Sequence, residues 1–201
     1  MRKILVWDWP VRIGHWLLAA AFCIAWLTAE SESGRLLHVG AGAMVLAIVS
    51  YRLLWGFIGS THARFRSFIR GPESLMNYLD GLLQLKPQAH TGHNPAGGWA
   101  IVALLALGLL TSLSGWLMYE DIQANRLEDA HEILASILLG IVFVHLAGVV
   151  VSSLLHRENL PRAMLTGRKE GTGEEAIAST HPIAALALLV WVAGVCWYIT
   201  A

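Results

Sequence analysis

The chain has 201 residues, of which 56% are hydrophobic and only 14% are charged. A soluble domain carries about a quarter charged residues, so this composition excludes an ordinary soluble protein and indicates a membrane protein. The formal net charge of zero gives no general attraction for nucleic acid. Cys23 and Cys196 form neither a CxxC nor a CxxCH motif, so they predict no disulfide framework and no covalent attachment of a cofactor.

Five apolar stretches follow one another along the chain, and each is long enough to cross a hydrocarbon core of roughly 30 Å as a helix. They cover residues 11–29, 36–58, 97–118, 128–155 and 183–200. Between the second and third, residues 72–85 place leucines at helical spacing and predict an amphipathic helix on the membrane surface. We therefore predict a helical domain over residues 1–165, a polar linker over 166–182 and an additional transmembrane helix over 183–201.

The charges flanking these stretches predict the orientation of the chain. If the spans alternate in direction, twelve of the fourteen lysines and arginines lie on one side, and only Arg35 and Arg126 lie on the other. Loops rich in lysine and arginine stay in the cytoplasm. The amino terminus is therefore expected in the cytoplasm and the carboxyl terminus on the external side.

The fourth stretch contains two histidines, His131 and His145, fourteen residues apart. On a helix this spacing puts them about 21 Å apart along the axis and within about 40° of the same face. Ionisable residues inside a membrane are costly and usually face the interior of a bundle. The two histidines therefore predict two buried sites at different depths.

Depth and direction sort four histidines into two levels. His15 lies at the cytoplasmic start of the first span, on the same side as His145, whereas His38 begins the second span at the external side, level with His131. Two imidazoles per level are too few for zinc, which usually has three or four protein ligands, but they fill both axial positions of a haem. We predict an all-α membrane protein in which a four-helix bundle holds two haems, with a fifth transmembrane helix outside the bundle.

Two other interpretations of the histidines stay open. A proton or metal-ion transporter would use the same side chains for its cargo. A structural membrane anchor would use them only for contacts between helices. The remaining histidines fall in predicted loops or at a helix end and are expected to be solvated: His62, His90, His93, His156 and His181.

Four arginines near the ends of the spans are candidates to bind haem propionates, because a guanidinium meets a carboxylate through two parallel hydrogen bonds. Arg12 and Arg52 lie on the predicted cytoplasmic side, and Arg35 and Arg126 lie on the external side. The external pair is the more informative, since it departs from the charge distribution that sets the orientation.

Four segments together carry a family resemblance. They are WPVRIGHW at residues 9–16, the segment 36–65 that begins LLHVGAGAM, GHNPAGG at 92–98, and the segment 130–169 that begins AHEILASILLG. Over roughly residues 5–169 the chain resembles the bacterial di-haem cytochrome b561 family, whose relatives include b-type cytochrome subunits of nickel-iron hydrogenases. The fifth apolar stretch lies outside this region.

The resemblance implies two non-covalent b haems with four axial ligands: His15, His145, His38 and His131. It also implies electron transfer in the bacterial inner membrane between a quinone pool and a periplasmic partner, such as a hydrogenase, a c-type cytochrome or superoxide. An electron would enter at one haem, pass to the other and leave. No catalytic residue is predicted, and it stays open whether the chain is an electron-transfer subunit or a quinone-linked oxidoreductase, and whether it forms a homodimer.

Overall fold

A computed structural model of the chain describes residues 2–86, 88 and 90–201. Its long helices are α1 (Trp9–Thr28), α2 (Arg35–Ile58), α5 (Pro95–Tyr119), α6 (Ala124–Leu155) and α8 (Pro182–Thr200). The shorter elements are β1 (Arg2–Leu5), η1 (Glu32–Gly34), α3 (Phe65–Phe68), α4 (Pro72–Leu83), α7 (Leu160–Thr166), β2 (Arg168–Gly171) and η2 (Gly173–Glu175). The five long helices coincide with the five apolar stretches of the sequence.

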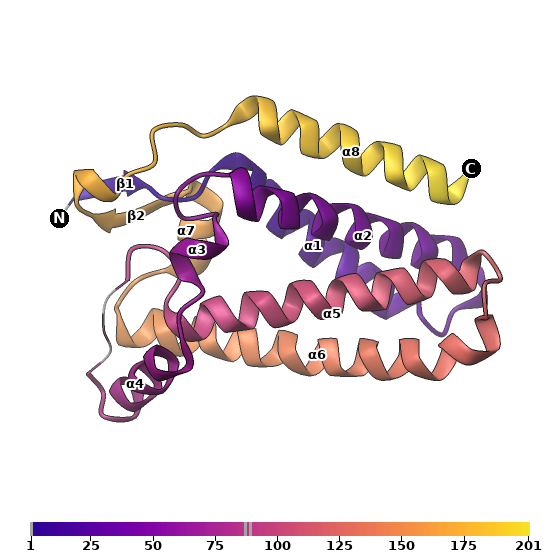
Figure 1. Cartoon of the computed structure of the whole chain (residues 1–201), viewed down its shortest axis with the longest axis horizontal. Helices are drawn as coiled ribbons and strands as arrows, with labels where there is room; N and C mark the ends of the chain where they lie inside the picture. The colour runs from indigo at the N-terminus through magenta and orange to yellow at the C-terminus, as the bar shows by residue number, and fades with distance from the viewer. Residues whose placement is uncertain (1, 87, 89) are drawn as a thin grey trace.

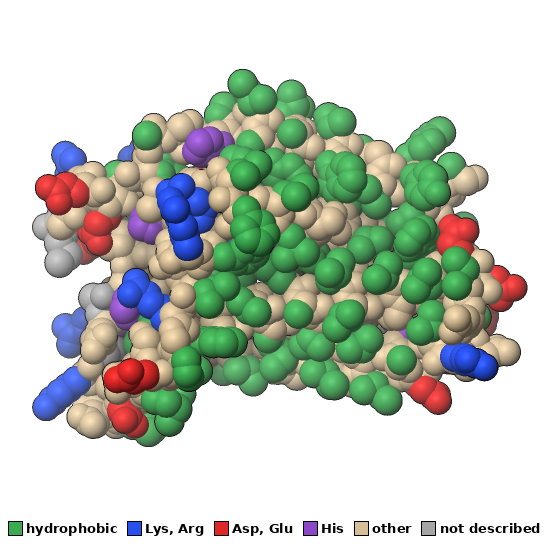
Figure 2. All heavy atoms as spheres, in the orientation of Figure 1, with side chains coloured by type: hydrophobic (Ala, Val, Ile, Leu, Met, Phe, Trp, Pro, Cys, Tyr) green, Lys and Arg blue, Asp and Glu red, His purple; other side chains and the backbone are tan. Residues whose placement is uncertain are grey.

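Each long helix has the length and the apolar composition to cross a membrane, with mean hydropathy between 1.5 and 2.6. Figure 2 shows hydrophobic side chains over the middle of the visible face and charged side chains at its two ends. This distribution is the one expected of a protein that spans a bilayer. The prediction of an all-α membrane protein with five spanning helices is confirmed.

Local signals fix where the helices begin. The side chain of Asp8 caps α1 by accepting a hydrogen bond from the Val11 amide at 2.9 Å, and the side chain of Asn94 caps α5 by accepting one from the Gly97 amide at 2.7 Å. A proline stands in the first turn of both helices, where its missing N–H leaves no bond unmade. The Asp8 carboxylate is fully buried and also accepts a hydrogen bond from Trp55 Nε1 at 3.0 Å, which ties the start of α1 to α2.

The bundle is built from neighbouring helix pairs. α1 packs along α2, α2 along α5, and α5 along α6, while α8 lies against α2 and α1 (Figure 1). α8 is held by polar as well as apolar contacts, because Tyr51 donates a hydrogen bond to the Ala184 carbonyl at 2.6 Å and Trp191 Nε1 donates to the Ala47 carbonyl at 3.1 Å. In the most apolar 18-residue segment of α6, only 6% of the residues are buried. Most of that helix is therefore available to lipid or to a cofactor.

The two ends of the bundle differ. At one end, named the sheet end here, β1 pairs antiparallel with β2, so that Arg2 is opposite Gly171. The sheet end also carries α3, α4 and α7, whereas the other end, the far end, has the short connections from α1 to α2 and from α5 to α6 (Figure 1). α4 corresponds to the amphipathic surface helix predicted for residues 72–85, and it exposes Met76, Leu79 and Leu83.

Residues 166–182, predicted to be a polar linker, contain β2 and η2. Ile177 is buried there, and its amide donates a hydrogen bond to the Leu5 carbonyl at 2.9 Å. Glu175 accepts hydrogen bonds from both the amide (3.0 Å) and the hydroxyl (2.8 Å) of Thr172. This segment is therefore attached to the amino-terminal strand before it leads into α8.

Candidate functional site

The structure brings His38 and His131 together near the far end of the bundle. Their ring centroids are 6.2 Å apart, and the ring planes are inclined by 73°. An imidazole nitrogen binds a first-row metal at about 2 Å, so two imidazoles on opposite sides of one iron have ring centres about 6 Å apart. The pair thus has the separation that two axial ligands of a haem require.

The outer nitrogen of each of these rings is held by the protein. His38 Nδ1 donates a hydrogen bond to the Ala25 carbonyl of α1 at 2.8 Å. His131 Nδ1 lies 3.0 Å from both the Thr111 carbonyl and the Ser114 hydroxyl of α5. Metal-binding histidines almost always donate their second N–H in this way, which fixes the tautomer and leaves Nε2 for the metal. Both residues therefore fit axial ligation through Nε2.

Gly115 makes room for the His131 ring. A Cβ atom added at Gly115 would lie 2.9 Å from Cε1 and 3.3 Å from Nδ1 of His131, which is too close for a real contact. Any larger residue at position 115 would therefore displace the His131 imidazole. Gly40 and Gly42 of α2 and Gly140 of α6 instead face open space, where no atom of the described residues would contact an added Cβ within 4 Å. Flat groups can approach a helix backbone at such positions.

His15 of α1 and His145 of α6, which are predicted to form the second level, lie nearer the sheet end than His38 and His131 do. Their side chains are close enough to interact electrostatically. His15 Nδ1 is buried and has no hydrogen-bond partner among the described residues. In the described structure α1 and α6 do not pack extensively against each other, because α2 and α5 lie between them in the order of packed pairs. The two histidines therefore come from helices that are not direct neighbours.

The four arginines predicted to bind propionates occupy different environments. Arg52 is buried more deeply than the others: Nη2 donates to the Ala63 carbonyl at 2.9 Å, and the guanidinium carbon lies 5.4 Å from the Phe65 ring centre. Arg12 donates to the Leu165 carbonyl. Arg35 and Arg126 are exposed at the far end. Of the four arginines predicted to bind propionates, Arg52 is thus the least accessible to solvent.

The prediction that the loop histidines are solvated is wrong for His93. Its ring lies 4.5 Å from the Trp7 ring and 4.8 Å from the Phe68 ring, measured between centroids. Its Nδ1 is buried without a hydrogen-bond partner among the described residues. Burial, followed by repulsion from Arg52 and Lys169, lowers the pKa of His93 to about 3, so the imidazole is neutral. Only its place in the GHNPAGG motif distinguished it in the sequence.

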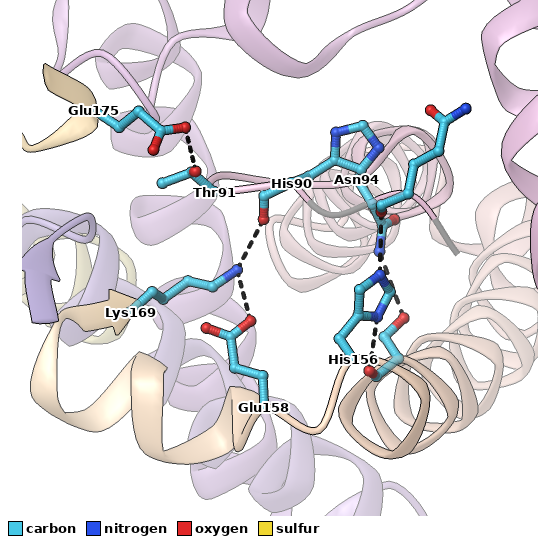
Figure 3. A network of polar contacts seen from close by, with 9 residues as sticks. His90, Thr91, Asn94, His156, Glu158, Lys169 and Glu175 are labelled. Carbon is cyan, nitrogen blue, oxygen red and sulfur yellow. Dashed lines mark hydrogen bonds and ion pairs between the residues drawn. The ribbon is translucent and has the colours of Figure 1, made fainter. Parts of the chain in front are cut away.

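A polar network holds the loop that contains His93 (Figure 3). Lys169 Nζ forms an ion pair with Glu158 at 3.1 Å and donates a hydrogen bond to the His90 carbonyl at 3.1 Å. Thr91 donates a hydrogen bond to Glu175. His156, which follows α6, donates to the Gln88 carbonyl at 3.1 Å. The segment after α6 and the segment before α8 therefore both bond to the loop that precedes α5, and they hold this loop at the sheet end.

Comparison with known proteins identifies the family of the chain. Residues 6–167 match the family described as prokaryotic cytochrome b561. A probable Ni/Fe-hydrogenase B-type cytochrome subunit of Rhizobium leguminosarum bv. viciae is 21% identical, over 84% of this chain and 89% of the relative. The corresponding protein of Rhodobacter capsulatus is 23% identical, over 83% and 81%. A hydrogenase 1 B-type cytochrome subunit of Escherichia coli K12 is 24% identical, over 58% and 60%.

No solved structure matches the chain significantly. The family match alone covers well over half of the sequence and includes all four paired histidines, His15, His38, His131 and His145. It ends before α8, so the fifth spanning helix lies outside the matched region. The chain belongs to the prokaryotic cytochrome b561 family and, as a b-type cytochrome, is a haem b protein of membrane electron transfer.

Proposed function

We propose that the chain carries electrons across the membrane through two b haems, one bound by His38 and His131 and the other by His15 and His145. Electrons pass between a quinone pool and a periplasmic redox partner. Haem b, when bound, supplies a reversible one-electron couple. The protein residues supply the axial nitrogens, the orientation of the rings and the charges around them.

One observation carries this proposal. The His38 and His131 rings are 6.2 Å apart, and a backbone carbonyl lies within 3.0 Å of the outer nitrogen of each. This arrangement leaves Nε2 of each ring free, at a ring separation that would suit two imidazoles bound to one metal ion. Because both axial positions are then filled by protein, the site favours electron transfer over oxygen binding.

Charge supports one orientation of the chain in a bacterial inner membrane. Twelve of the fourteen lysines and arginines flank the spans on the side of the amino terminus, which the positive-inside rule assigns to the cytoplasm. The sheet end is then cytoplasmic, and Ala201, which follows α8 at the far end (Figure 1), is periplasmic. The His38–His131 level is the periplasmic one, and the His15–His145 level is the cytoplasmic one.

The partners follow from this orientation and from the relatives. The curated relatives are named as B-type cytochrome subunits of Ni/Fe-hydrogenases, which supports a hydrogenase as the periplasmic partner. A c-type cytochrome or a small oxidant such as superoxide is the alternative. The quinone site lies near the cytoplasmic haem, beside the basic loops of the sheet end. The chain then acts as an electron-transfer subunit.

A spectrum of the purified protein tests the proposal. We expect a reduced-minus-oxidised spectrum of b type and a pyridine haemochrome assay that gives two non-covalent haems per chain. A proton or metal-ion transporter that uses the same histidines would be colourless. A structural anchor would keep its properties in His131→Ala and His145→Ala variants. A protein without haem would refute the proposal in favour of one of these two.

A second measurement tests the quinone site. In His15→Ala, reoxidation of the reduced protein by added quinone should be lost, because the haem nearest the quinone is missing. His38→Ala is the matched control: it removes a ligand of the other level, and the remaining haem should still be reoxidised by quinone after chemical reduction. Unchanged reoxidation in His15→Ala would contradict a quinone site at the sheet end.

A further inference from the structure

Several buried polar atoms at the sheet end have no hydrogen-bond partner among the described residues, and two of them belong to side chains that share Phe68 as a neighbour. These two are Nη1 of Arg52, on α2, and Nδ1 of His93, in the loop before α5. A buried donor without an acceptor is unfavourable, and native proteins rarely leave one unsatisfied. Both atoms therefore indicate a group that binds between these elements.

Arg52 has only part of its hydrogen-bonding capacity used by the protein. Its Nη2 donates to the Ala63 carbonyl at 2.9 Å, and its flat guanidinium lies near Phe65 and Phe68, at 5.4 and 6.0 Å from the ring centres. Asp8 acts on Arg52 electrostatically, but the two Asp8 oxygens already accept hydrogen bonds from Val11 and Trp55. The charge of Arg52 thus has no carboxylate of its own within ion-pairing distance in the described residues.

His93 lies next to Arg52 through a shared neighbour. Phe68 contacts both side chains, with its ring centre 4.8 Å from the His93 ring and 6.0 Å from the Arg52 guanidinium. His93 is also within electrostatic range of His145, the proposed axial ligand of the cytoplasmic haem. A neutral imidazole keeps one N–H to donate. His93 therefore lies between Arg52 and the histidine that is proposed to bind the cytoplasmic haem, within electrostatic range of both.

We propose that Arg52 and His93 together bind one propionate of the haem held by His15 and His145, an inference that rests on the proposed function. A carboxylate accepts several hydrogen bonds at once and neutralises a guanidinium. It would satisfy both unpartnered atoms and would give the charge of Arg52 a partner within ion-pairing distance. A buried water molecule, the simplest alternative occupant, would satisfy the two donors but would leave that charge without a partner.

The test uses the intact haem-loaded protein and compares Arg52→Gln, His93→Ala and His93→Gln with His90→Ala. His90 lies three residues from His93 in the same loop. Its Nε2 is also buried without a partner among the described residues, but its ring lies beside Tyr78, so it serves as the control for loss of a buried imidazole from this loop. Redox titration resolves the two haems, and resonance Raman spectroscopy reports the propionate bending band, which is sensitive to hydrogen bonds at the carboxylate. Both readouts are independent of quinone activity.

We expect one haem of the two to shift to a lower potential in Arg52→Gln, because losing a nearby cation favours the ferric state. His93→Ala should shift the same haem by less and should move the Raman band. His93→Gln should restore the band, since the amide can donate a hydrogen bond. The double variant Arg52→Gln/His93→Ala should shift the potential by less than the sum of the two single changes, because both side chains bind one group.

Two results separate failure of this inference from failure of the proposed function. If the wild-type protein binds no haem, the proposed function fails. If it binds two haems and both the potentials and the Raman band in His93→Ala match those in His90→Ala, the propionate assignment is overturned and a buried water molecule takes its place. If Arg52→Gln does not fold, the comparison of His93→Ala with His93→Gln still decides.

Discussion

The two histidine levels are built in different ways. At the far end, the His38 and His131 rings lie 6.2 Å apart, and a carbonyl or hydroxyl oxygen holds the outer nitrogen of each ring. At the sheet end, His15 Nδ1 and, separately, Arg52 Nη1 are buried without a partner among the described residues. The far end thus orients its imidazoles with protein atoms alone.

The difference follows from the connections at each end. Between α1 and α2 and between α5 and α6 the chain makes short turns, which bring Ala25 to His38 and Ser114 to His131. At the sheet end, long connections add α3, α4, α7 and the β1–β2 pair. We infer that the far level is rigid before the cofactor binds, whereas the sheet level depends on contacts that the cofactor completes.

The largest expected effect tests whether the two levels are independent. His131→Ala should remove the far haem, which is the one proposed between His38 and His131. It should leave the sheet haem, proposed between His15 and His145, in place, because these two histidines do not contact the substituted position. The pyridine haemochrome assay should give one haem per chain in place of two.

His156→Ala is the control for this substitution. His156 follows the same helix, and in the described part of the chain its ring nitrogens bond to the Ser152 and Gln88 carbonyls, so both haems should be retained. Loss of both haems from His131→Ala would mean that the two levels fold as one unit.

A second substitution tests how rigid the far level is. Gly115→Ala would bring a Cβ to 2.9 Å from His131 Cε1, and the ring cannot move away without losing its contacts with Thr111 and Ser114. Overpacking of this kind costs about 1–3 kcal/mol. We expect weaker binding of the far haem, measured by haem titration, and an unchanged sheet haem.

Gly194→Ala, on α8, serves as the matched control, because no atom in the part of the chain that the structure describes lies within 4 Å of an added Cβ there. It should leave haem binding unaltered. Equal haem affinity in Gly115→Ala and Gly194→Ala would show that the far level adapts readily, contrary to the comparison above.

A third substitution weakens the sheet end alone. The Lys169 side chain is 5% exposed and that of Glu158 is 25% exposed. Removing one partner of a fully buried pair costs about 3–5 kcal/mol, and the partial exposure of Glu158 reduces this to about 2 kcal/mol for Lys169→Met. Amide exchange in β1 and β2 should become about 30-fold faster. Lys86 is exposed, so Lys86→Met is the control and should leave the exchange rate in β1 and β2 unchanged. Faster amide exchange near His38 in Lys169→Met would show that the two ends of the bundle are coupled.

Much of the frame could be predicted from the sequence because its signals are local. Five apolar stretches give the five long helices, and the histidine spacing on the fourth gives two levels. The pairing of His38 with His131 as ligands stays a prediction, and the 6.2 Å between their ring centroids supports it. Membrane helices are easier to predict than most elements because every backbone polar group must be satisfied within the segment.

The parts that sequence reasoning missed depend on contacts between distant residues. β1 pairs with a strand more than 160 residues away, and neither four-residue segment carries a clear alternating pattern. His93 lies in a loop rich in glycine and polar residues, and its burial depends on Trp7 and Phe68. Ser114 is one of several serines and threonines in α5, and its contact with His131 depends on how α5 is rotated against α6.

The smallest expected effect is a pH dependence confined to the sheet end. Hydrogen bonds from Thr91 and Thr172 lower the pKa of Glu175 from 4.5 to about 2. Because the folded-state pKa lies below the unfolded value, the contribution of Glu175 is complete above about pH 4.5 and is lost as the pH falls toward 2. Amide exchange at Thr172 should accelerate over this window in the wild type but not in Glu175→Gln, while the neighbouring Glu174→Gln should behave like the wild type. A matching acceleration at the far end would contradict the separation of the two levels, because no contact of Glu175 reaches His38 or His131 in the described residues.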